Sequence, residues 1–355
     1  MRKITRSIGL VFATAGTVAG LTLANAAAAE AANKALMVNG LGAGDLSPAA
    51  MGLLLGGMFS TYDRQNVSWP AQARPVTGKD SKTLTESVKI GADNLDAAIT
   101  SSLAQLKPGE YITVVGLSAG ALVVDEEMKR LAAKATAPDK SKINFVVVAD
   151  SSRTLFNKNR FDPTVSYQYS LPAETKYNTT VVTGQYDGYA DFPDKKPRVT
   201  DPKFKDYMTY AVPNAIAGSQ LIHIPSMLTN LNTVPKNWVT TTTNAKGGVT
   251  TSYLVPSTTL PLVSLNPKLK PQEAQLRKII DSFYTRPTPA VAAPAPAPAP
   301  AAAVPSAPAA PAAAAADSPA AAPAAAATPV RRSAFGKAAA ARAAAAAKLS
   351  KPSAD

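Results

Sequence analysis

The chain contains no cysteine and only one histidine, His223, in its 355 residues. The absence of cysteine excludes disulfide bonds, attachment of a lipid to an amino-terminal cysteine, and a thiol nucleophile. The single histidine means that any imidazole base in this protein must be His223. We expect neither a metal ion nor an organic cofactor.

The two ends of the chain differ in composition from its middle. Residues 1–31 start with basic residues, continue with an apolar run over 8–24, and end in small residues that include two A-x-A sites. This order is typical of a cleaved secretory signal peptide, with an uncleaved membrane anchor as the alternative. We therefore expect a protein that is secreted or associated with the cell envelope.

Residues 287–355 consist mainly of alanine and proline and lack the spaced large apolar residues that a core requires. This composition predicts a disordered tail. The net charge of +13 is shared between the ends and the middle, with +2 on residues 1–31 and +4 on the tail. For an exported chain we expect the basic tail to meet an anionic envelope surface, and we expect no nucleic-acid partner. The oligomeric state is left open.

The remaining segment, 33–286, alternates apolar runs with amphipathic stretches. The runs at 34–40, 111–117, 143–150, 179–188 and 220–224 are typical of strands, whereas 81–106 and 121–135 have apolar residues at helical spacing. This alternation predicts a single α/β domain with a mostly parallel sheet and helices on both faces. Ligands of such sheets bind at the carboxyl ends of the strands.

One of those ends carries the motif Gly116-Leu117-Ser118-Ala119-Gly120, between an apolar strand and an amphipathic helix. Strand, G-x-S-x-G and helix together form a nucleophile elbow, in which the serine adopts a strained backbone above the sheet. Side chains two positions before and after the serine would collide, which explains both glycines. Ser118 is therefore the candidate nucleophile.

A serine hydroxyl needs a base to accept its proton, and the base needs an acid to orient it. His223 is the only imidazole, and it follows the serine in the chain order expected for this elbow. The acid is expected at a strand end between them. Asp187 is the first choice, Asp191 the second and Asp150 the third.

An acyl-transfer site also needs two backbone N–H groups for the oxyanion. The N–H of Ala119 is the first candidate, since it follows the nucleophile. The second is expected in the glycine-rich loop 39–44 after the first strand, and Leu41 is the candidate there.

Several of these segments resemble the PE-PPE domain family, the serine α/β-hydrolases of mycobacteria and related actinobacteria. The resemblance runs from about Ala35 to Arg286 and depends on the motifs GLGAGDLSP, GLSAG, YDGYADFPDKKP, NAIAGSQLIH and YLVPSTTLPL. It implies an α/β-hydrolase fold, with the nucleophile at Ser118, the acid at Asp187 and the histidine at His223. Because no PE or PPE module precedes these motifs, the chain resembles a free-standing exported form.

The resemblance implies action on acyl esters with lipid-like substrates. The leading hypothesis is an exported serine esterase or lipase, with an acyl-serine intermediate. An alternative is an envelope acyltransferase that moves fatty acyl groups between trehalose-type glycolipids. A third hypothesis, from another class, is a non-catalytic cell-wall binding protein on a hydrolase fold.

Overall fold

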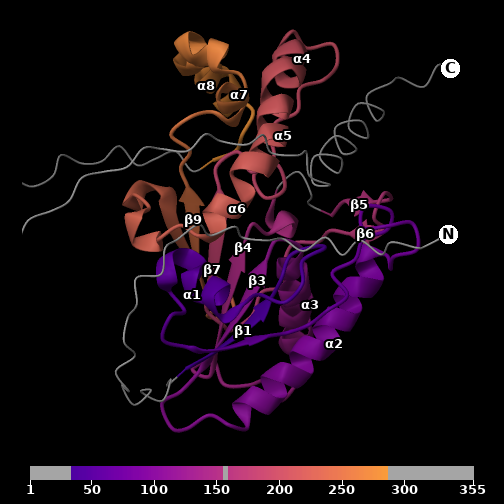
Figure 1. The fold of residues 1–355 in the computed structure, drawn as a ribbon, viewed down its shortest axis with the longest axis vertical. Coiled ribbons are helices and arrows are strands. Elements are labelled where there is room, and N and C mark those ends of the chain that lie inside the picture. Colours follow the sequence, from indigo (N-terminus) through magenta and orange to yellow (C-terminus); the bar gives the residue numbers. More distant parts are fainter. Residues whose placement is uncertain (1–32, 155–158, 287–355) are drawn as a thin grey trace, which may run out of the picture.

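The computed structural model describes residues 33–154 and 159–286. The predicted signal peptide (1–31) and the predicted tail (287–355) lie outside the described residues. At the centre is a seven-stranded sheet with the order β2-β1-β3-β4-β7-β9-β8 (Figure 1). Its strands are β1 (Lys34–Val38), β2 (Asp63–Asn66), β3 (Ile112–Leu117), β4 (Ile143–Val148), β7 (Thr179–Gly184), β8 (Val239–Thr243) and β9 (Val249–Val255).

The helices are α1 (Pro48–Gly57), α2 (Leu84–Leu103), α3 (Ala119–Ala133), α4 (Lys203–Asp206), α5 (Val212–Leu221), α6 (His223–Met227), α7 (Pro261–Leu265) and α8 (Glu273–Asp281). Short turns of 3₁₀ helix lie at η1 (Ser151–Arg153), η4 (Leu231–Thr233), η5 (Lys236–Trp238) and η6 (Pro267–Gln272), and a π-helical turn, η3 (Tyr207–Ala211), leads into α5. A small hairpin pairs β5 (Phe161–Asp162) with β6 (Tyr167–Gln168).

All neighbouring strands of the large sheet are parallel except β8 and β9, which form an antiparallel edge. The chain passes from β1 outward to β2 and then returns to β3 on the other side of β1. The loops that leave β1 and β3 therefore diverge at the carboxyl end of the sheet, which is where open α/β sheets bind ligands.

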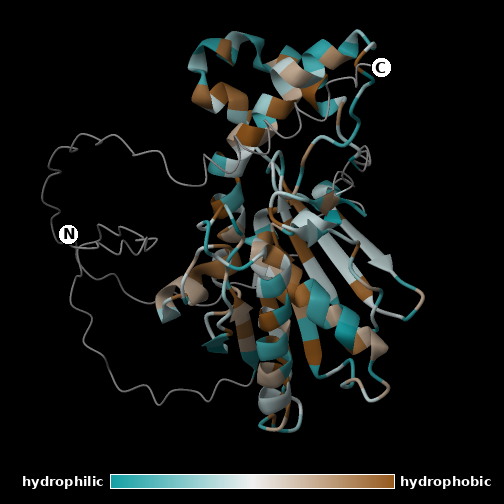
Figure 2. Cartoon of the chain, turned by 90° about the vertical axis from the view of Figure 1, so that its right-hand side faces the viewer, coloured by the Kyte–Doolittle hydropathy of each residue, from teal (hydrophilic) through white to brown (hydrophobic). Residues whose placement is uncertain are grey.

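Helices cover both faces of the sheet. One apolar cluster joins α2 and α3 to one face, and a second joins α1 and the segment around α6 to the other. In Figure 2 hydrophilic and hydrophobic residues alternate along the helices, as amphipathic packing requires. This mostly parallel sheet between helical layers is the predicted α/β-hydrolase fold.

A helical lobe stands above the carboxyl ends of the strands. We call it the cap; it consists of α4, η3, α5, α7, η6 and α8 (Figure 1). Two small apolar clusters hold it together, and one of them includes Tyr186 from the turn after β7. Its lower end is continuous with the site, because α5 leads through Ile222 directly into α6. The sequence did not indicate this lobe.

The prediction of a strand over 220–224 is wrong, because this segment joins α5 to α6. The five-residue apolar run suggested a strand, but the buried residues there follow helical spacing. Ala215, Ser219, His223 and Met227 recur every four residues and are all buried.

Among the described residues, none of the helices is both long and apolar enough to cross a membrane.

The interface between α2 and α3 contains an unusual carboxyl group, Glu127. The residue is fully buried, and neither carboxyl oxygen has a hydrogen-bond partner among the described residues. Burial raises the pKa of Glu127 to about 8, and the negative charge of Asp96 on α2 adds to this rise, while Lys134 and Arg130 oppose it. The folded protein therefore holds a proton on Glu127 that the unfolded chain releases near pH 4.5.

From this we predict that the protein loses stability as the pH rises from about 5 to 8, because ionisation of Glu127 costs free energy only in the folded state. Glu127→Gln removes the ionisation and keeps the shape. Its thermal midpoint should exceed that of the wild type by ~2 °C or more at pH 8.5, with the difference vanishing near pH 5. Thermal unfolding across this pH range measures it. Glu126→Gln, on the half-exposed neighbour, is the control. A difference that does not depend on pH would contradict the prediction.

Candidate active site

Ser118 occupies the sharp turn between β3 and α3. Its backbone has φ 54° and ψ −123°, a strained conformation for a residue with a side chain. The surrounding hydrogen bonds hold this strain. The Ser118 N–H donates to the carbonyl of Val148 at 2.8 Å, and the Ser118 carbonyl accepts from the N–H of Ala121 at 2.9 Å. The serine is partly exposed, unlike the buried strand before it.

The two glycines of the motif are required by close approach. A Cβ at Gly116 would lie 2.7 Å from the Cα of Ala121, and a Cβ at Gly120 would lie 2.3 Å from the carbonyl oxygen of Val38. Both distances are shorter than real Cβ contacts. The turn that lifts Ser118 therefore forms only with glycine at these positions, as the sequence predicted.

The structure brings the three predicted side chains into one hydrogen-bonded chain. His223 Nε2 lies 2.9 Å from Ser118 Oγ, and His223 Nδ1 lies 2.7 Å from Asp187 Oδ2. Asp187 and His223 are almost completely buried. The second carboxyl oxygen of Asp187 accepts the backbone N–H of Tyr189 at 2.9 Å, which fixes its orientation. The ring of Tyr189 packs edge-on against the imidazole, with 5.0 Å between the ring centroids.

A tight contact sets the distance between the acid and the histidine. Gly218 of α5 lies so close to the turn after β7 that a Cβ there would lie 1.7 Å from the carbonyl oxygen of Tyr186. Gly188, next to Asp187, also packs closely on α5, since a Cβ there would lie 2.3 Å from the carbonyl oxygen of Ala215. Since His223 follows directly after α5, this contact brings its ring to the carboxylate.

The other two candidate acids have different partners. Asp191 accepts the N–H of Tyr186 at 2.7 Å and forms a buried ion pair with Arg286 at 2.5 Å. Burial raises the pKa of Asp191, and the positive charge of Arg286 opposes this rise.

Asp150 forms an ion pair with Arg153 at 2.7 Å and accepts a hydrogen bond from the hydroxyl of Ser152 at 2.9 Å. Neither Asp191 nor Asp150 is bonded to the imidazole, so the geometry favours Asp187, the first choice of the sequence analysis.

The glycine-rich loop after β1 lies against the nucleophile. A Cβ at Gly40 would be 3.2 Å from the Cβ of Ser118 and 3.7 Å from its Oγ. The loop is anchored by the Trp69 Nε1–H, which donates to the carbonyl of Asn39 at 3.0 Å, and by the Gly42 N–H, which donates to Ala71 at 2.8 Å. Leu41, the predicted second oxyanion donor, follows Gly40 in this anchored loop.

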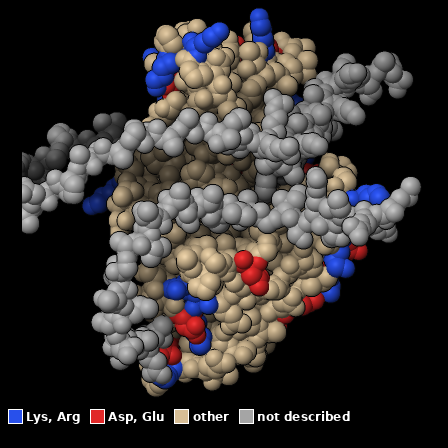
Figure 3. All heavy atoms as spheres, viewed as in Figure 1, with Lys and Arg blue, Asp and Glu red and all other residues tan. Residues whose placement is uncertain are grey.

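The visible surface below the cap shows few charged groups. Where atoms of described residues are visible in Figure 3, Lys and Arg gather at the top of the cap, and the hollow between the cap and the body of the sheet is largely uncharged. Large apolar side chains remain exposed on the two helices beside His223, namely Leu53 of α1, Ile224 of α6 and Leu228, which caps α6. No group of three or more His, Asp or Glu side chains among the described residues could hold a metal ion.

The mostly parallel sheet and this elbow are those of the α/β-hydrolase fold. Residues 60–285 match the model of the PE-PPE domain, so the chain belongs to the PE-PPE domain family. Three relatives from Mycobacterium tuberculosis illustrate the range of named activities. The first, named SL1278 acyltransferase Chp1, is 36% identical over 65% of this chain and 56% of its own length.

The second, named diacyltrehalose acyltransferase Chp2, is 31% identical over 61% of this chain and 62% of its own length. The third, named esterase PE16, is 29% identical over 70% of this chain and 47% of its own length. The chain thus spans less than two thirds of each of these relatives.

The different partners of the two carboxylates predict different consequences for stability. Asp191→Asn leaves the buried guanidinium of Arg286 without its closest counter-charge, so the thermal midpoint should fall by ~5 °C or more. Asp187→Asn leaves only an imidazole, which need not carry charge, and should lower the midpoint by less than half as much. Thermal unfolding of both purified variants near pH 7 provides the measurement. A larger loss for Asp187→Asn would mean that its role is mainly structural.

Proposed function

We propose that this protein is a serine enzyme that acts on acyl esters through an acyl-Ser118 intermediate. The observation that carries the proposal is the continuous hydrogen-bonded chain from Ser118 Oγ through His223 to Asp187. Membership of the PE-PPE family and relatives named as acyltransferases and as an esterase support it. A non-catalytic binding protein would have no need for this arrangement at a strained serine.

In the first half-reaction, His223 Nε2 accepts the hydroxyl proton of Ser118 while Oγ attacks the acyl carbon of the ester. Asp187 holds the ring and stabilises its positive charge. The N–H groups of Ala119 and Leu41 are the proposed donors to the oxyanion. The tetrahedral intermediate then collapses, the alcohol leaves with the proton from His223, and the acyl group remains on Ser118.

In the second half-reaction, an acceptor hydroxyl gives its proton to His223 and attacks the acyl carbon, and Ser118 regains its proton as it leaves. Water as the acceptor gives a carboxylic acid, and a second alcohol gives a new ester. We propose hydrolysis as the basic activity. The exposed Leu53, Ile224 and Leu228 favour substrates with apolar acyl chains, as in a lipase.

A second candidate function is acyl transfer to a sugar hydroxyl. The observation that favours it is the pair of relatives named as acyltransferases, one of them for diacyltrehalose. Both functions use the same acyl-enzyme. We place the protein outside the cytoplasm, at the cell envelope; the amino-terminal sequence pattern supports this placement, and the basic tail suits contact with an anionic envelope surface.

The proposal predicts covalent labelling of Ser118 by a fluorophosphonate probe, since the activated hydroxyl attacks phosphorus and displaces fluoride. Turnover of a soluble p-nitrophenyl ester should fall by ~10⁴-fold or more in Ser118→Ala, with the thermal midpoint unchanged. His223→Ala should lose both labelling and turnover. The assignment would be overturned if the folded Ser118→Ala variant were labelled, or if it kept a tenth of the wild-type turnover.

Product analysis distinguishes hydrolysis from acyl transfer. With a p-nitrophenyl ester as donor and trehalose at millimolar concentration as acceptor, mass spectrometry distinguishes the free acid from the acylated sugar. A hydrolase gives mainly acid, whatever the sugar concentration. Acylated trehalose as the main product would instead assign the second function.

A further inference from the structure

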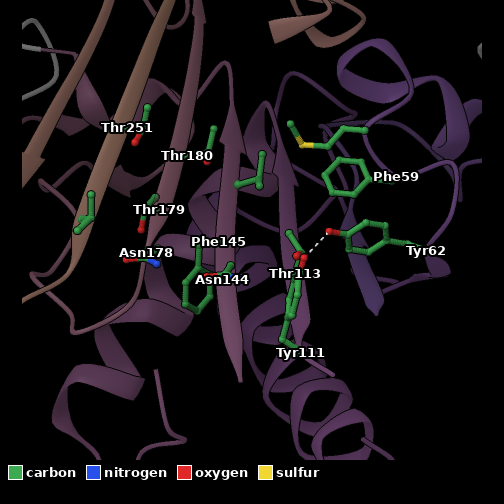
Figure 4. A pocket seen from close by; sticks show the side chains of 13 residues that line it. Phe59, Tyr62, Tyr111, Thr113, Asn144, Phe145, Asn178, Thr179, Thr180 and Thr251 are labelled. Atoms are coloured by element: carbon green, nitrogen blue, oxygen red, sulfur yellow. Dashed lines mark hydrogen bonds between the residues drawn. The ribbon is translucent and has the colours of Figure 1, made fainter. Parts of the chain in front are cut away.

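The amino ends of the central strands carry a pocket that lies far from Ser118. It has a volume of about 370 Å³ and is lined by residues of β3, β4, β7 and β9 together with the segment after α1 (Figure 4). Thr113 at this pocket precedes Ser118 by five residues of extended chain, a separation of ~16 Å. The pocket therefore lies outside the proposed acyl-transfer site.

The pocket exists because one face of the sheet is only partly covered. Side chains of a strand alternate between its faces, and the apolar members of this face, such as Val115 and Val182, pack under α1 and the segment around α6. Two residues earlier on the same strands, the sequence changes to Thr113 and Thr180. A parallel sheet that is buried on both faces would carry apolar residues there.

The exposed part of this face presents polar side chains in register. Asn144 pairs with Thr113, and Thr180 pairs with Thr251, so their side chains form adjacent rungs. Asn178 extends the row before β7. Within the described residues, the side chains of Asn144, Asn178, Thr180 and Thr251 make no hydrogen bond to protein. They offer hydroxyl and amide groups, both donors and acceptors, to a ligand.

Aromatic rings form the opposite wall. Figure 4 shows Phe59, Tyr62 and Tyr111 on the side of the pocket away from β9. The hydroxyl groups of Tyr62 and Tyr111 are hydrogen-bonded at 2.9 Å, and Phe59 packs edge-on against Tyr62 with 5.5 Å between centroids. These contacts hold the rings in place. Both tyrosines are half-buried, so part of each ring remains accessible.

The lining excludes several classes of ligand. None of its 13 residues is charged, so neither an anion nor a cation would find a counter-charge. An acyl chain would bury the Asn and Thr groups without hydrogen-bond partners, which is unfavourable. A peptide strand would need a free sheet edge, whereas this pocket lies on a sheet face. A sugar has hydroxyl groups for the polar row and an apolar C–H face for the aromatic rings.

We propose that this pocket binds a neutral saccharide of one or two sugar units, at a site separate from Ser118. Its volume is at the small end of the range for ligand pockets. The proposal does not depend on the proposed acyl chemistry. Such a site would attach the enzyme to a carbohydrate-bearing surface while the carboxyl end of the sheet remains free for catalysis.

Saturation-transfer difference NMR on the full chain tests this proposal with maltose and trehalose as probes at millimolar concentration. We expect saturation transfer to the ring protons of at least one of them. In Thr180→Val/Thr251→Val the signal should fall at least five-fold, because valine keeps the shape and the strand preference but removes the hydroxyl groups. Thr240→Val/Thr242→Val is the matched control and should keep the full signal, because these residues pair with Ser252 and Thr250 on the opposite face of β8 and β9.

A thermal unfolding curve and the turnover of a soluble ester accompany each variant, and neither should change. Should the double variant at the pocket fail to fold, Asn178→Ala at an exposed position replaces it, with the same expected loss of signal. Absence of saturation transfer to both sugars would overturn the proposal. So would an undiminished signal in the pocket variant, because the sugar would then bind elsewhere, for example as an acyl acceptor beside Ser118.

Discussion

The imidazole of His223 is the one group that touches both of the other members of the site. It joins the strained turn after β3 to the buried turn after β7 through hydrogen bonds of 2.9 Å to Ser118 and 2.7 Å to Asp187. Its position depends on backbone packing more than on its own contacts, since α5 reaches the Asp187 turn only because Gly218 has no side chain. A shift of α5 would separate the histidine from the acid while leaving the sheet intact.

The same constraint explains why the cap and the sheet form one unit. The turn after β7 packs against α5 at Gly188, and its Asp191 is paired with Arg286 at the end of the described segment. The guanidinium carbon of Arg286 also lies 4.5 Å from the ring centroid of Tyr186 and 4.0 Å from that of Tyr284. The two buried carboxylates of this turn therefore have different roles. Asp187 is hydrogen-bonded to the histidine, and Asp191 pairs with Arg286, which follows the last helix of the cap.

The sequence predicted most of the parallel sheet and the elbow, because buried strands and amphipathic helices leave clear periodic patterns and Gly116 and Gly120 have a steric reason to be there. The prediction of a strand at 220–224 was wrong, since a short run rich in apolar residues fits a strand as well as a junction between two helices. Asp187 and Asp191 are four residues apart in one turn, so only their three-dimensional partners distinguish them. The cap was missed in part because α4 and α7 have only four and five residues, although α5 and α8 have ten and nine.

Hydrolysis and acyl transfer differ in a property that the triad does not control. In the proposed mechanism, the fate of the acyl group on Ser118 depends on which hydroxyl reaches it first, and that depends on the surface around the elbow. In this protein α6 carries both His223 and the exposed Ile224, and the cap stands above the carboxyl ends of the strands. Relatives named as acyltransferases and as an esterase can therefore share one catalytic arrangement, and residues that govern the acceptor are best sought on the cap and on α1 rather than among Ser118, Asp187 and His223.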